Sequence, residues 1–279
     1  MRHIIIVLLF ISCVFAAGAR VDLKYDYLHA GIAPRIQALG ETGMISAEGP
    51  ESIYYNPALL VFDTDKTLLV GMTNLGYDQQ QFFAYYRLPI AYRNALFSIG
   101  LVSHQISGIE VRNASNAFPQ NMTASDMMLV MGISRFLGPR TSFGMSLQWM
   151  LDDYTTDHQV GVNFLFGLSH YYSDKVRANI IFRYLGEGQM VAGSGVRLSI
   201  GDQLILYSTA DLFLSDGLNQ VILHNGLAWS VTSGFELLVG CDGANLSFGA
   251  TQCFDGFAIQ LSYTDTPIGS RYSVGIELL

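Results

Sequence analysis

Four residues that could activate water or bind a cation lie close together in this 279-residue chain. They are Asp152, Asp153, Asp157 and His158. Paired carboxylates with a histidine can act as general acid and base, and carboxylate oxygens are the ligands that Ca²⁺ prefers. Catalytic pairs of this kind face each other across a cleft, whereas these four residues are expected on one hairpin turn. We interpret the cluster as a solvated turn, with a Ca²⁺ contact as the alternative.

Other sequence signals of chemistry are lacking. No phosphate-binding loop, zinc-ligand spacing or nucleophile motif occurs in the chain. The sequence therefore predicts neither an enzyme nor a bound metal or cofactor. The formal net charge is −8 at pH 7 and charged residues make up only 14% of the chain, which argues against a nucleic-acid partner.

Three arginines are candidates for binding an anionic head group. They are Arg177, Arg183 and Arg197. A guanidinium can hold a carboxylate by two parallel hydrogen bonds. We favour ion pairing within the protein instead, because a charge in a restricted space needs a partner. The expected partners are carboxylates near the N-terminus, namely Glu41, Glu48 and Glu51.

From residue 67 onwards the chain predicts a scaffold for these groups. Segments of roughly ten residues alternate apolar and polar side chains between Gly, Asp, Ser or Pro turns, which is typical of a transmembrane β-barrel. The fold class is therefore all-β, an antiparallel barrel of about fourteen strands, an even number as single-chain bacterial barrels require. The predicted strands are Thr67–Leu75, Gln80–Pro89, Asn94–Ser107, Asp126–Phe136, Thr141–Asp152, His158–Leu168, Lys175–Leu185, Gln189–Ile200, Asp202–Leu212, Gln220–Ser230, Phe235–Cys241, Asn245–Cys253, Phe257–Thr264 and Ser270–Leu279.

The alternation also assigns each residue to a face of the barrel. In Thr141–Asp152 it directs Met145 and Trp149 to lipid and Ser146 and Gln148 to the lumen. The same phase places the three arginines inside, because a lipid-facing arginine at mid-membrane costs roughly 2 to 4 kcal/mol. With both termini periplasmic, the one long connection, Gly108–Ser125, falls on the extracellular side.

One expected strand, Asn94–Ser107, carries two further candidates. Gly100 and Ser103 could mark a kink, since glycine in a strand often marks a bend, and ordinary lumen packing is the alternative. His104 points inward and could titrate near a ligand. We favour a hydrogen-bonded pore residue with no catalytic role.

The N-terminus predicts export to the bacterial outer membrane. A positive charge precedes an apolar run from Ile4 to Phe15, which is too short to span a bilayer, and Ala17-Gly18-Ala19 fits a small-residue cleavage site. Residues 1–19 are therefore a predicted signal peptide. Lipid attachment at Cys13 is the alternative to ordinary removal of this segment.

The mature chain is expected to form one domain, the barrel of residues 67–279 preceded by a segment of residues 20–62. Cys241 and Cys253 fall at opposite ends of one expected hairpin, so no disulfide between them is predicted. A fourteen-stranded barrel is wider than the eight-stranded barrels that side chains alone fill. Within residues 30–62, Gly and Pro break regular structure while apolar residues supply compact contacts, and this segment is the expected plug.

Three blocks of the plug carry a family resemblance. Ala33-Pro34-Arg35, Ala38-Leu39-Gly40 and Ser52-Ile53-Tyr54-Tyr55-Asn56-Pro57-Ala58 resemble the N-terminal hatch of the FadL long-chain fatty acid transporters and the related PorV/PorQ outer-membrane proteins. The resemblance implies a fourteen-stranded barrel occluded by its hatch. It also implies that the hatch or gating residues are Arg35, Gly40, Tyr54, Tyr55, Asn56, Pro57 and Ala58.

By the same resemblance, the activity would be diffusion-driven uptake of hydrophobic molecules such as long-chain fatty acids, with exit sideways through a kinked strand. The partners would then be a hydrophobic small-molecule ligand and outer-membrane lipid. Two alternatives stay open. Asn-Pro also simply starts turns and short helices, so the hatch is either a mobile gate or a static plug. PorV-type relatives indicate a secretion-associated barrel with a periplasmic or secretion partner, or a structural or adhesive one.

Overall fold

The computed structural model describes most of the chain. The described residues are 32–62, 67–90, 95–111, 120–154, 157–185, 189–215, 218–243, 245–266 and 269–279. The expected signal peptide, Cys13 and residues 20–31 of the expected hatch lie outside these ranges.

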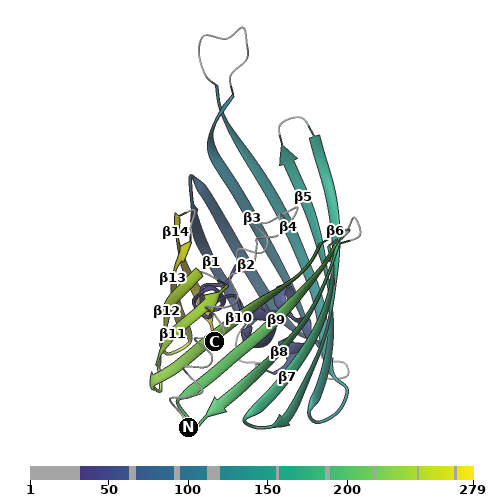
Figure 1. Ribbon diagram of the computed structural model, residues 1–279, viewed down its shortest axis with the longest axis vertical. Coiled ribbons are helices and arrows are strands. Elements are labelled where there is room, and N and C mark those ends of the chain that lie inside the picture. Colours follow the sequence, from purple (N-terminus) through teal and green to yellow (C-terminus); the bar gives the residue numbers. More distant parts are fainter. Residues whose placement is uncertain are drawn as a thin grey trace.

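Fourteen antiparallel strands form a closed barrel, as predicted (Figure 1). Each strand pairs with its neighbours in the sequence, and β1 closes the ring by pairing with β14, with Leu68 opposite Leu278. The strands are β1 (Leu68–Gly76), β2 (Gln79–Ile90), β3 (Ala95–Val111), β4 (Gln120–Phe136), β5 (Thr141–Tyr154), β6 (Asp157–Ser173), β7 (Val176–Tyr184), β8 (Met190–Ile200), β9 (Leu204–Ser215), β10 (Leu218–Thr232), β11 (Phe235–Asp242), β12 (Asn245–Cys253), β13 (Phe257–Thr266) and β14 (Gly269–Leu278).

The two-residue alternation decides which side chains face outward. In β5, Met145 and Trp149 are exposed on the outer surface, whereas Ser146 and Gln148 are buried in the interior. In β7, Ile180 and Phe182 are exposed while Arg177 and Asn179 are buried. The predicted phase is therefore correct on both strands, and the barrel presents an apolar outer band around a polar interior.

The wall is taller on one side than on the other. Strands β3, β4 and β6 each contain 17 residues, whereas β11 contains 8. The β3–β4 hairpin projects beyond its neighbours (Figure 1). We call this end of the barrel the hairpin rim and the end at which β14 finishes the C-terminal rim.

The extra length corrects two predictions. Within the expected loop Gly108–Ser125, residues 108–111 and 120–125 are strand, since Ile109 pairs with Met122 and Val111 with Gln120. Asp153 pairs with His158, so the acidic cluster sits in the ends of β5 and β6 and not in a turn. Strands can continue past the bilayer on backbone hydrogen bonds alone, and there the apolar alternation that marks a membrane strand is no longer required.

Gly100 and Ser103, where a kink of β3 was predicted, lie in regular strand pairing. The β2–β3 pairing runs without a shift through both positions, and β3 changes register against β4 between Ile106 and Ile109. A Cβ at Gly100 would lie 2.2 Å from Cδ1 of Tyr85, so the Tyr85 ring occupies the space over this glycine. Gly100 is explained by packing.

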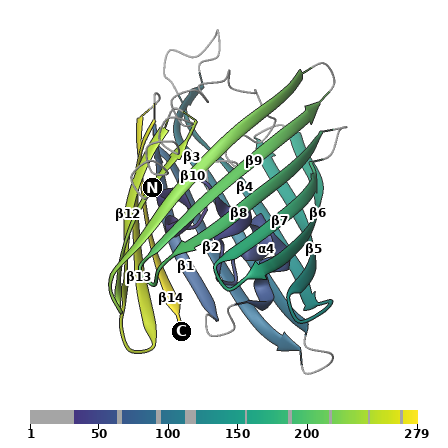
Figure 2. The same cartoon turned by 60° about the horizontal axis from the view of Figure 1, so that its bottom comes forward.

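Among the described residues, four short helices precede the barrel and lie within the ring of strands (Figure 2). They are α2 (Pro34–Ala38), α3 (Gly43–Ser46), α4 (Ser52–Tyr55) and the 3₁₀ helix η2 (Pro57–Val61). We call residues 32–62 the inner segment; nearly all of its residues are buried. Within the described ranges, no helix has the length and apolar character needed to cross a bilayer. Cys253 is a free, exposed thiol, so no disulfide joins it to Cys241.

Candidate lumen site

The inner segment follows the inside of the wall around the barrel. Helix α2 contacts β11 to β14, α3 contacts β7 to β9, and α4 with η2 contacts β3 to β6. Its apolar residues join strand residues in two clusters, one around Ile53 and Leu59 and the other around Leu39 and Ile45. The lumen at this level is therefore filled by the chain itself.

Glycines in the wall allow the backbone of the inner segment to come close. A Cβ added at Gly240 would lie 2.1 Å from the backbone nitrogen of Gly40, and one at Gly144 would lie 2.3 Å from the carbonyl carbon of Pro57. Gly40 itself has φ +66° and approaches the backbone of Cys241. Because these contacts are backbone to backbone, any side chain at these positions would displace the segment.

Asn56-Pro57-Ala58 forms a helix start that is bonded to the wall. The Asn56 side chain accepts a hydrogen bond from the Ala58 N–H at 3.1 Å and donates to the Met44 carbonyl at 2.8 Å. Pro57 occupies the first turn of η2, where its missing N–H costs nothing. Ser142 of β5 donates to the Ala58 carbonyl at 2.6 Å.

The two tyrosines before this block connect parts of the segment. The Tyr55 hydroxyl accepts hydrogen bonds from the backbone N–H groups of Ile32, at 2.6 Å, and Ala33, at 3.3 Å. The Tyr54 carbonyl accepts from the Arg183 guanidinium at 2.9 Å, and the Arg183 guanidinium lies 5.5 Å from the centre of the Tyr54 ring. Arg183 therefore contacts the expected plug through a carbonyl and a ring.

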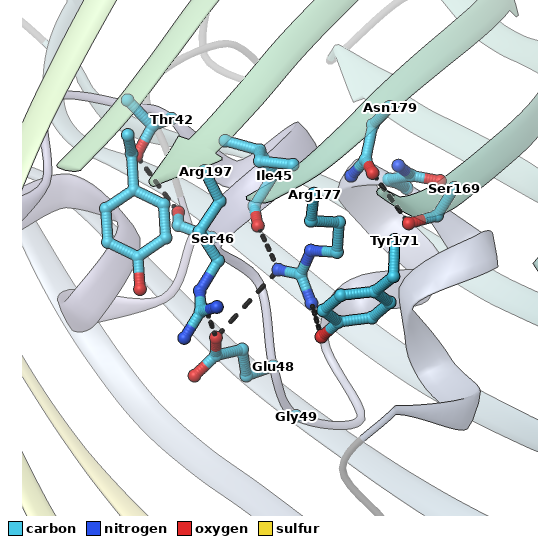
Figure 3. Close-up of polar contacts among 12 residues, drawn as sticks. Thr42, Ile45, Ser46, Glu48, Gly49, Ser169, Tyr171, Arg177, Asn179 and Arg197 are labelled. Carbon is cyan, nitrogen blue, oxygen red and sulfur yellow. Dashed lines mark hydrogen bonds and ion pairs between the residues drawn. The ribbon is translucent and has the colours of Figure 1, made fainter. Parts of the chain in front are cut away.

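Arg177 and Arg197 lie toward the C-terminal rim, because β7 begins and β8 ends there. Figure 3 shows both side chains around Glu48 of the inner segment. Oε1 of Glu48 lies 3.9 Å from NH2 of Arg177 and 3.8 Å from Nε of Arg197. Arg35 of α2 joins them, with its NH2 3.8 Å from Oε2 of Glu48 and its Nε donating to Glu236 at 3.2 Å. We call these five residues the arginine cluster.

Arg177 is the most enclosed member of the cluster. It is 1% exposed and donates to the Tyr171 hydroxyl at 3.0 Å and to the Ile45 carbonyl (Figure 3). Its guanidinium lies over the rings of Phe62, at 5.5 Å, and Tyr171, at 5.4 Å. One arginine thus connects β7, β6, helix α3 and the end of the inner segment.

A second charged group lies on the side of the inner segment that faces the hairpin rim. His224 of β10 has its Nδ1 3.0 Å from Asp242 and its Nε2 3.4 Å from Asp211. Glu41 of the inner segment shares a cavity of about 70 Å³ with His224, Asp211 and Arg183. The apolar part of its wall comes from Met44, Ile181, Val191 and Phe213. We call this space the hairpin-side cavity.

The carboxyl of Glu41 is held in its neutral form near pH 7. Burial, together with the charge of Asp242, raises the pKa of Glu41 from 4.5 to about 8, and Arg271 and His224 act in the opposite direction. Burial disfavours the charged form of a carboxyl, and a second carboxylate nearby disfavours it again. Glu41 also has a backbone φ of 64°, unusual for a residue with a side chain.

His104 belongs to neither group. It is 2% exposed, with Nδ1 3.3 Å from Asp126 and Nε2 3.4 Å from Gln79. The interpretation as a hydrogen-bonded pore residue agrees with these partners. Among the residues that the structure describes, no group of three or more His, Cys, Asp or Glu could hold a metal ion.

Several charged residues of the site were not among the sequence candidates. Asp211, His224 and Asp242 were missed, as was Glu236 in the arginine cluster. Each lies on the inward phase of its strand, so the same alternation that located the three arginines would have located them. Arg35 was assigned to the hatch by resemblance, and its pairing with Glu236 could not be inferred from that.

Comparisons with known proteins show which solved structures share this fold. No family model matches the chain, and no curated protein sequence does. The crystal structure of the Pseudomonas putida toluene transporter TodX superposes with a TM-score of 0.63 at 13% identity, over 88% of this chain and 96% of that one. The chain has the fold of this channel. Two further structures share this fold. A Pseudomonas aeruginosa FadL homologue superposes with a TM-score of 0.57 at 10% identity, over 83% of this chain and 94% of that one. The CymD monoaromatic hydrocarbon channel superposes with a TM-score of 0.55 at 12% identity, over 90% of this chain and 97% of that one. The FadL-type resemblance of the sequence is thereby confirmed for the fold.

Proposed function

We propose that this chain is a passive channel for small hydrophobic molecules in a bacterial outer membrane, closed at rest by its inner segment. The observation that carries the proposal is the combination of an apolar outer band with a lumen filled by residues 32–62. A barrel with this exterior is stable only in lipid. The proposal assigns no chemical reaction to the chain.

The type of ligand follows from two considerations. Similar folds are described as a toluene transporter and a monoaromatic hydrocarbon channel. In this chain the hairpin-side cavity has apolar residues on one wall, and its volume of about 70 Å³ is too small for an extended alkyl chain. A long-chain fatty acid would therefore have to displace part of the inner segment, whereas a compact hydrophobic molecule needs less movement.

The decisive experiment compares uptake by one variant in two states, with its inner segment free or cross-linked to the barrel wall by a disulfide. The ideal Cβ of Gly195 on β8 lies 3.1 Å from Cβ of Ile45 on α3, so a shift of α3 by a few tenths of an ångström would bring the two positions to the roughly 3.5 to 4.5 Å that a disulfide spans. The double variant Ile45→Cys with Gly195→Cys, made in a Cys253→Ser background, should cross-link when oxidised. In proteoliposomes, the reduced form should take up radiolabelled benzoate esters and decanoate, and the oxidised form should not.

Three outcomes are informative. Uptake in the reduced form alone supports a gated channel, and a preference for the ester over decanoate supports compact ligands. Equal uptake in both forms contradicts gating by the inner segment. No uptake in either form, with co-purification of secretion components, would favour the secretion-associated alternative.

A further inference from the structure

The exposed cations of the described chain gather on one sector of the outer wall. Among the lysines and arginines that the structure describes, those with exposed side chains are Arg135, Arg140 and Lys175. Arg135 lies near the end of β4, Arg140 lies in the β4–β5 turn and Lys175 lies in the β6–β7 turn. All three positions are therefore at the C-terminal rim, on neighbouring strands.

No carboxylate of the described chain neutralises these three cations. Arg140 donates a hydrogen bond to the Tyr172 carbonyl at 3.3 Å, and the side chains of Arg135 and Lys175 make no hydrogen bond or ion pair with a described residue. Asp174 is exposed beside Lys175 in the β6–β7 turn. Three cations against this one carboxylate leave the sector with a formal charge of +2.

The rest of the same rim carries the opposite charge. The β8–β9 turn exposes Asp202 and the β12–β13 turn exposes Asp255. Within the described part of β8 to β14, no lysine or arginine is exposed. The positive charge is therefore confined to the β4–β7 sector and does not form a belt around the barrel.

The sector lies at the level where the apolar band ends. Arg135 is outward-facing on β4 and is the next outward residue after the exposed Ile133. A lipid-facing arginine is costly at mid-membrane and nearly free of cost at the membrane interface. Leu137 and Tyr172 are 57% and 65% exposed at the same end, and tyrosine is typical of the interface. The three cations thus lie at the height of lipid head groups.

A histidine on the outer wall adds a further polar group between the cations. Thr141 of β5 pairs with His170 of β6, and Nδ1 of His170 lies 2.8 Å from Oγ1 of Thr141. The His170 ring also packs edge-on against the Tyr172 ring, with 4.8 Å between the ring centres. Nε2 of His170 makes no hydrogen bond to a described residue and is left for an outside partner. Because β4 and β6 are two strand spacings apart, about 10 Å, long side chains from both can reach one group between them.

We propose that this basic sector, formed by Arg135, Arg140, His170, Tyr172 and Lys175, is a binding site for the head group of an anionic phospholipid. The acyl chains of the lipid lie against the exposed apolar side chains of β4 to β7, which include Ile133, Met145, Phe166, Leu168 and Ile180. A soluble anion would meet the positive charge alone, whereas a phospholipid meets both the charge and the apolar band. The site is on the outer wall, so it does not depend on the proposed channel function.

The test uses two single-tryptophan reporters at the same rim. The only tryptophans of the chain are Trp149 and Trp229. Trp149→Phe leaves Trp229 of β10, which is 46% exposed on the outer wall and lies in the sector without exposed cations. Trp149→Phe with Trp229→Phe and Phe143→Trp places the reporter on the outward phase of β5, in register with Arg135 and Leu168.

The measurement is fluorescence quenching in phosphatidylcholine liposomes that contain brominated phosphatidylglycerol or brominated phosphatidylcholine. At low salt, the Phe143→Trp reporter should show about tenfold preference for phosphatidylglycerol, and Trp229 should show almost none. Arg140→Gln should lower the preference at the Phe143→Trp reporter about threefold, whereas Arg140→Lys should retain most of it, because the charge is kept. High salt should weaken the preference, since the cations are exposed.

The Trp229 reporter combined with Arg140→Gln is the matched control, and its quenching should not change. Heat-modifiable gel mobility verifies that each variant is folded. Replacing chloride by inorganic phosphate at equal ionic strength should leave the preference intact. A loss of preference in phosphate but not in chloride would assign the site to a free anion and overturn the proposal. Equal quenching by both lipids at the Phe143→Trp reporter, or the same preference at both reporters, would also overturn it.

Discussion

The two faces of the inner segment differ in the charges that they meet on the barrel wall. Toward the C-terminal rim, the segment presents Glu48 to Arg177 and Arg197 of the wall, so unlike charges meet across the boundary. Toward the hairpin rim, it presents Glu41 to a wall that contains Asp211 and Asp242 around His224. There a carboxyl meets carboxylates, and burial with the Asp242 charge keeps Glu41 neutral near pH 7.

The difference indicates how a closed channel could open from one side. A segment attached by attraction on one face and by a conditional, protonation-dependent contact on the other has a fixed end and a releasable end. The glycine contacts of Gly240 and Gly144 add backbone packing at both levels. We expect changes at the arginine cluster to release the segment as a whole and changes around Glu41 to affect only its hairpin-rim side.

The largest effect is expected from deleting the inner segment, which removes both of its faces at once. Deleting residues 30–62 should convert a nearly silent protein into one with stable open-channel conductance in planar bilayers, since these residues fill the lumen. The oxidised Ile45→Cys, Gly195→Cys variant is the matched closed form and should stay silent. Equal conductance from the intact and deleted proteins would remove the basis for any comparison of the two faces.

The next effect compares one arginine from each face. Arg177→Ala removes the hydrogen bonds to Tyr171 and the Ile45 carbonyl and one of the three guanidiniums beside Glu48, at a cost of about 3 kcal/mol. Arg183→Ala loses one hydrogen bond to the Tyr54 carbonyl, at a cost of about 1 kcal/mol. The rate at which proteinase K cleaves the inner segment should therefore rise far more in Arg177→Ala. A greater rise in Arg183→Ala would reverse our assignment of the fixed end.

A smaller effect is expected at the backbone contact. Gly240→Ala places a methyl group 2.1 Å from the Gly40 nitrogen and should destabilise the packing of the segment by about 1 to 3 kcal/mol. Cleavage of the segment by protease should accelerate while the barrel keeps its heat-modifiable mobility. Gly138→Ala is the control, because a Cβ there meets nothing within 4 Å. If the two variants behave alike, the close approach at Gly240 does not hold the inner segment in place.

The fold was largely predictable because a membrane strand leaves a two-residue period that bilayer energetics enforce. The number of strands, their order and the inward phase of Arg177 all follow from that period. The ends of β3, β4, β5 and β6 did not follow, since the sequence there lacks the apolar alternation of a membrane strand. Nor did the role of Gly100, because the ring that covers it belongs to a different strand, at Tyr85.

The site was predictable only in part. The sequence identified Glu48 as one of three carboxylates that could meet the lumen arginines, but spacing along the chain cannot say which of Glu41, Glu48 and Glu51 lies at which height in the barrel. That depends on how Gly40 and Glu41, both at positive φ, turn the segment between α2 and α3. His224 and its two aspartates carried an inward-phase signal, yet their meeting depends on the register among β9, β10 and β11.

The last effect to test is the titration of Glu41 at the releasable end. The pKa of Glu41 is about 8 in the folded chain and 4.5 for a solvated glutamate, as in the unfolded chain, so folding favours the protonated form. The stabilisation that this provides is complete below pH 4.5 and is lost as the pH rises through 8. Because pH 6 lies two units below the folded pKa of about 8, linkage allows cleavage of the inner segment by protease to become up to about a hundredfold faster between pH 6 and pH 9, relative to a denatured reference substrate. Glu41→Gln should abolish that step, because the amide stays neutral throughout. Glu48→Gln, on the other face, should retain it. A pH step of the same size in Glu41→Gln would show that a different group controls the hairpin-rim side, and the comparison of the two faces would then have to be redrawn around His224.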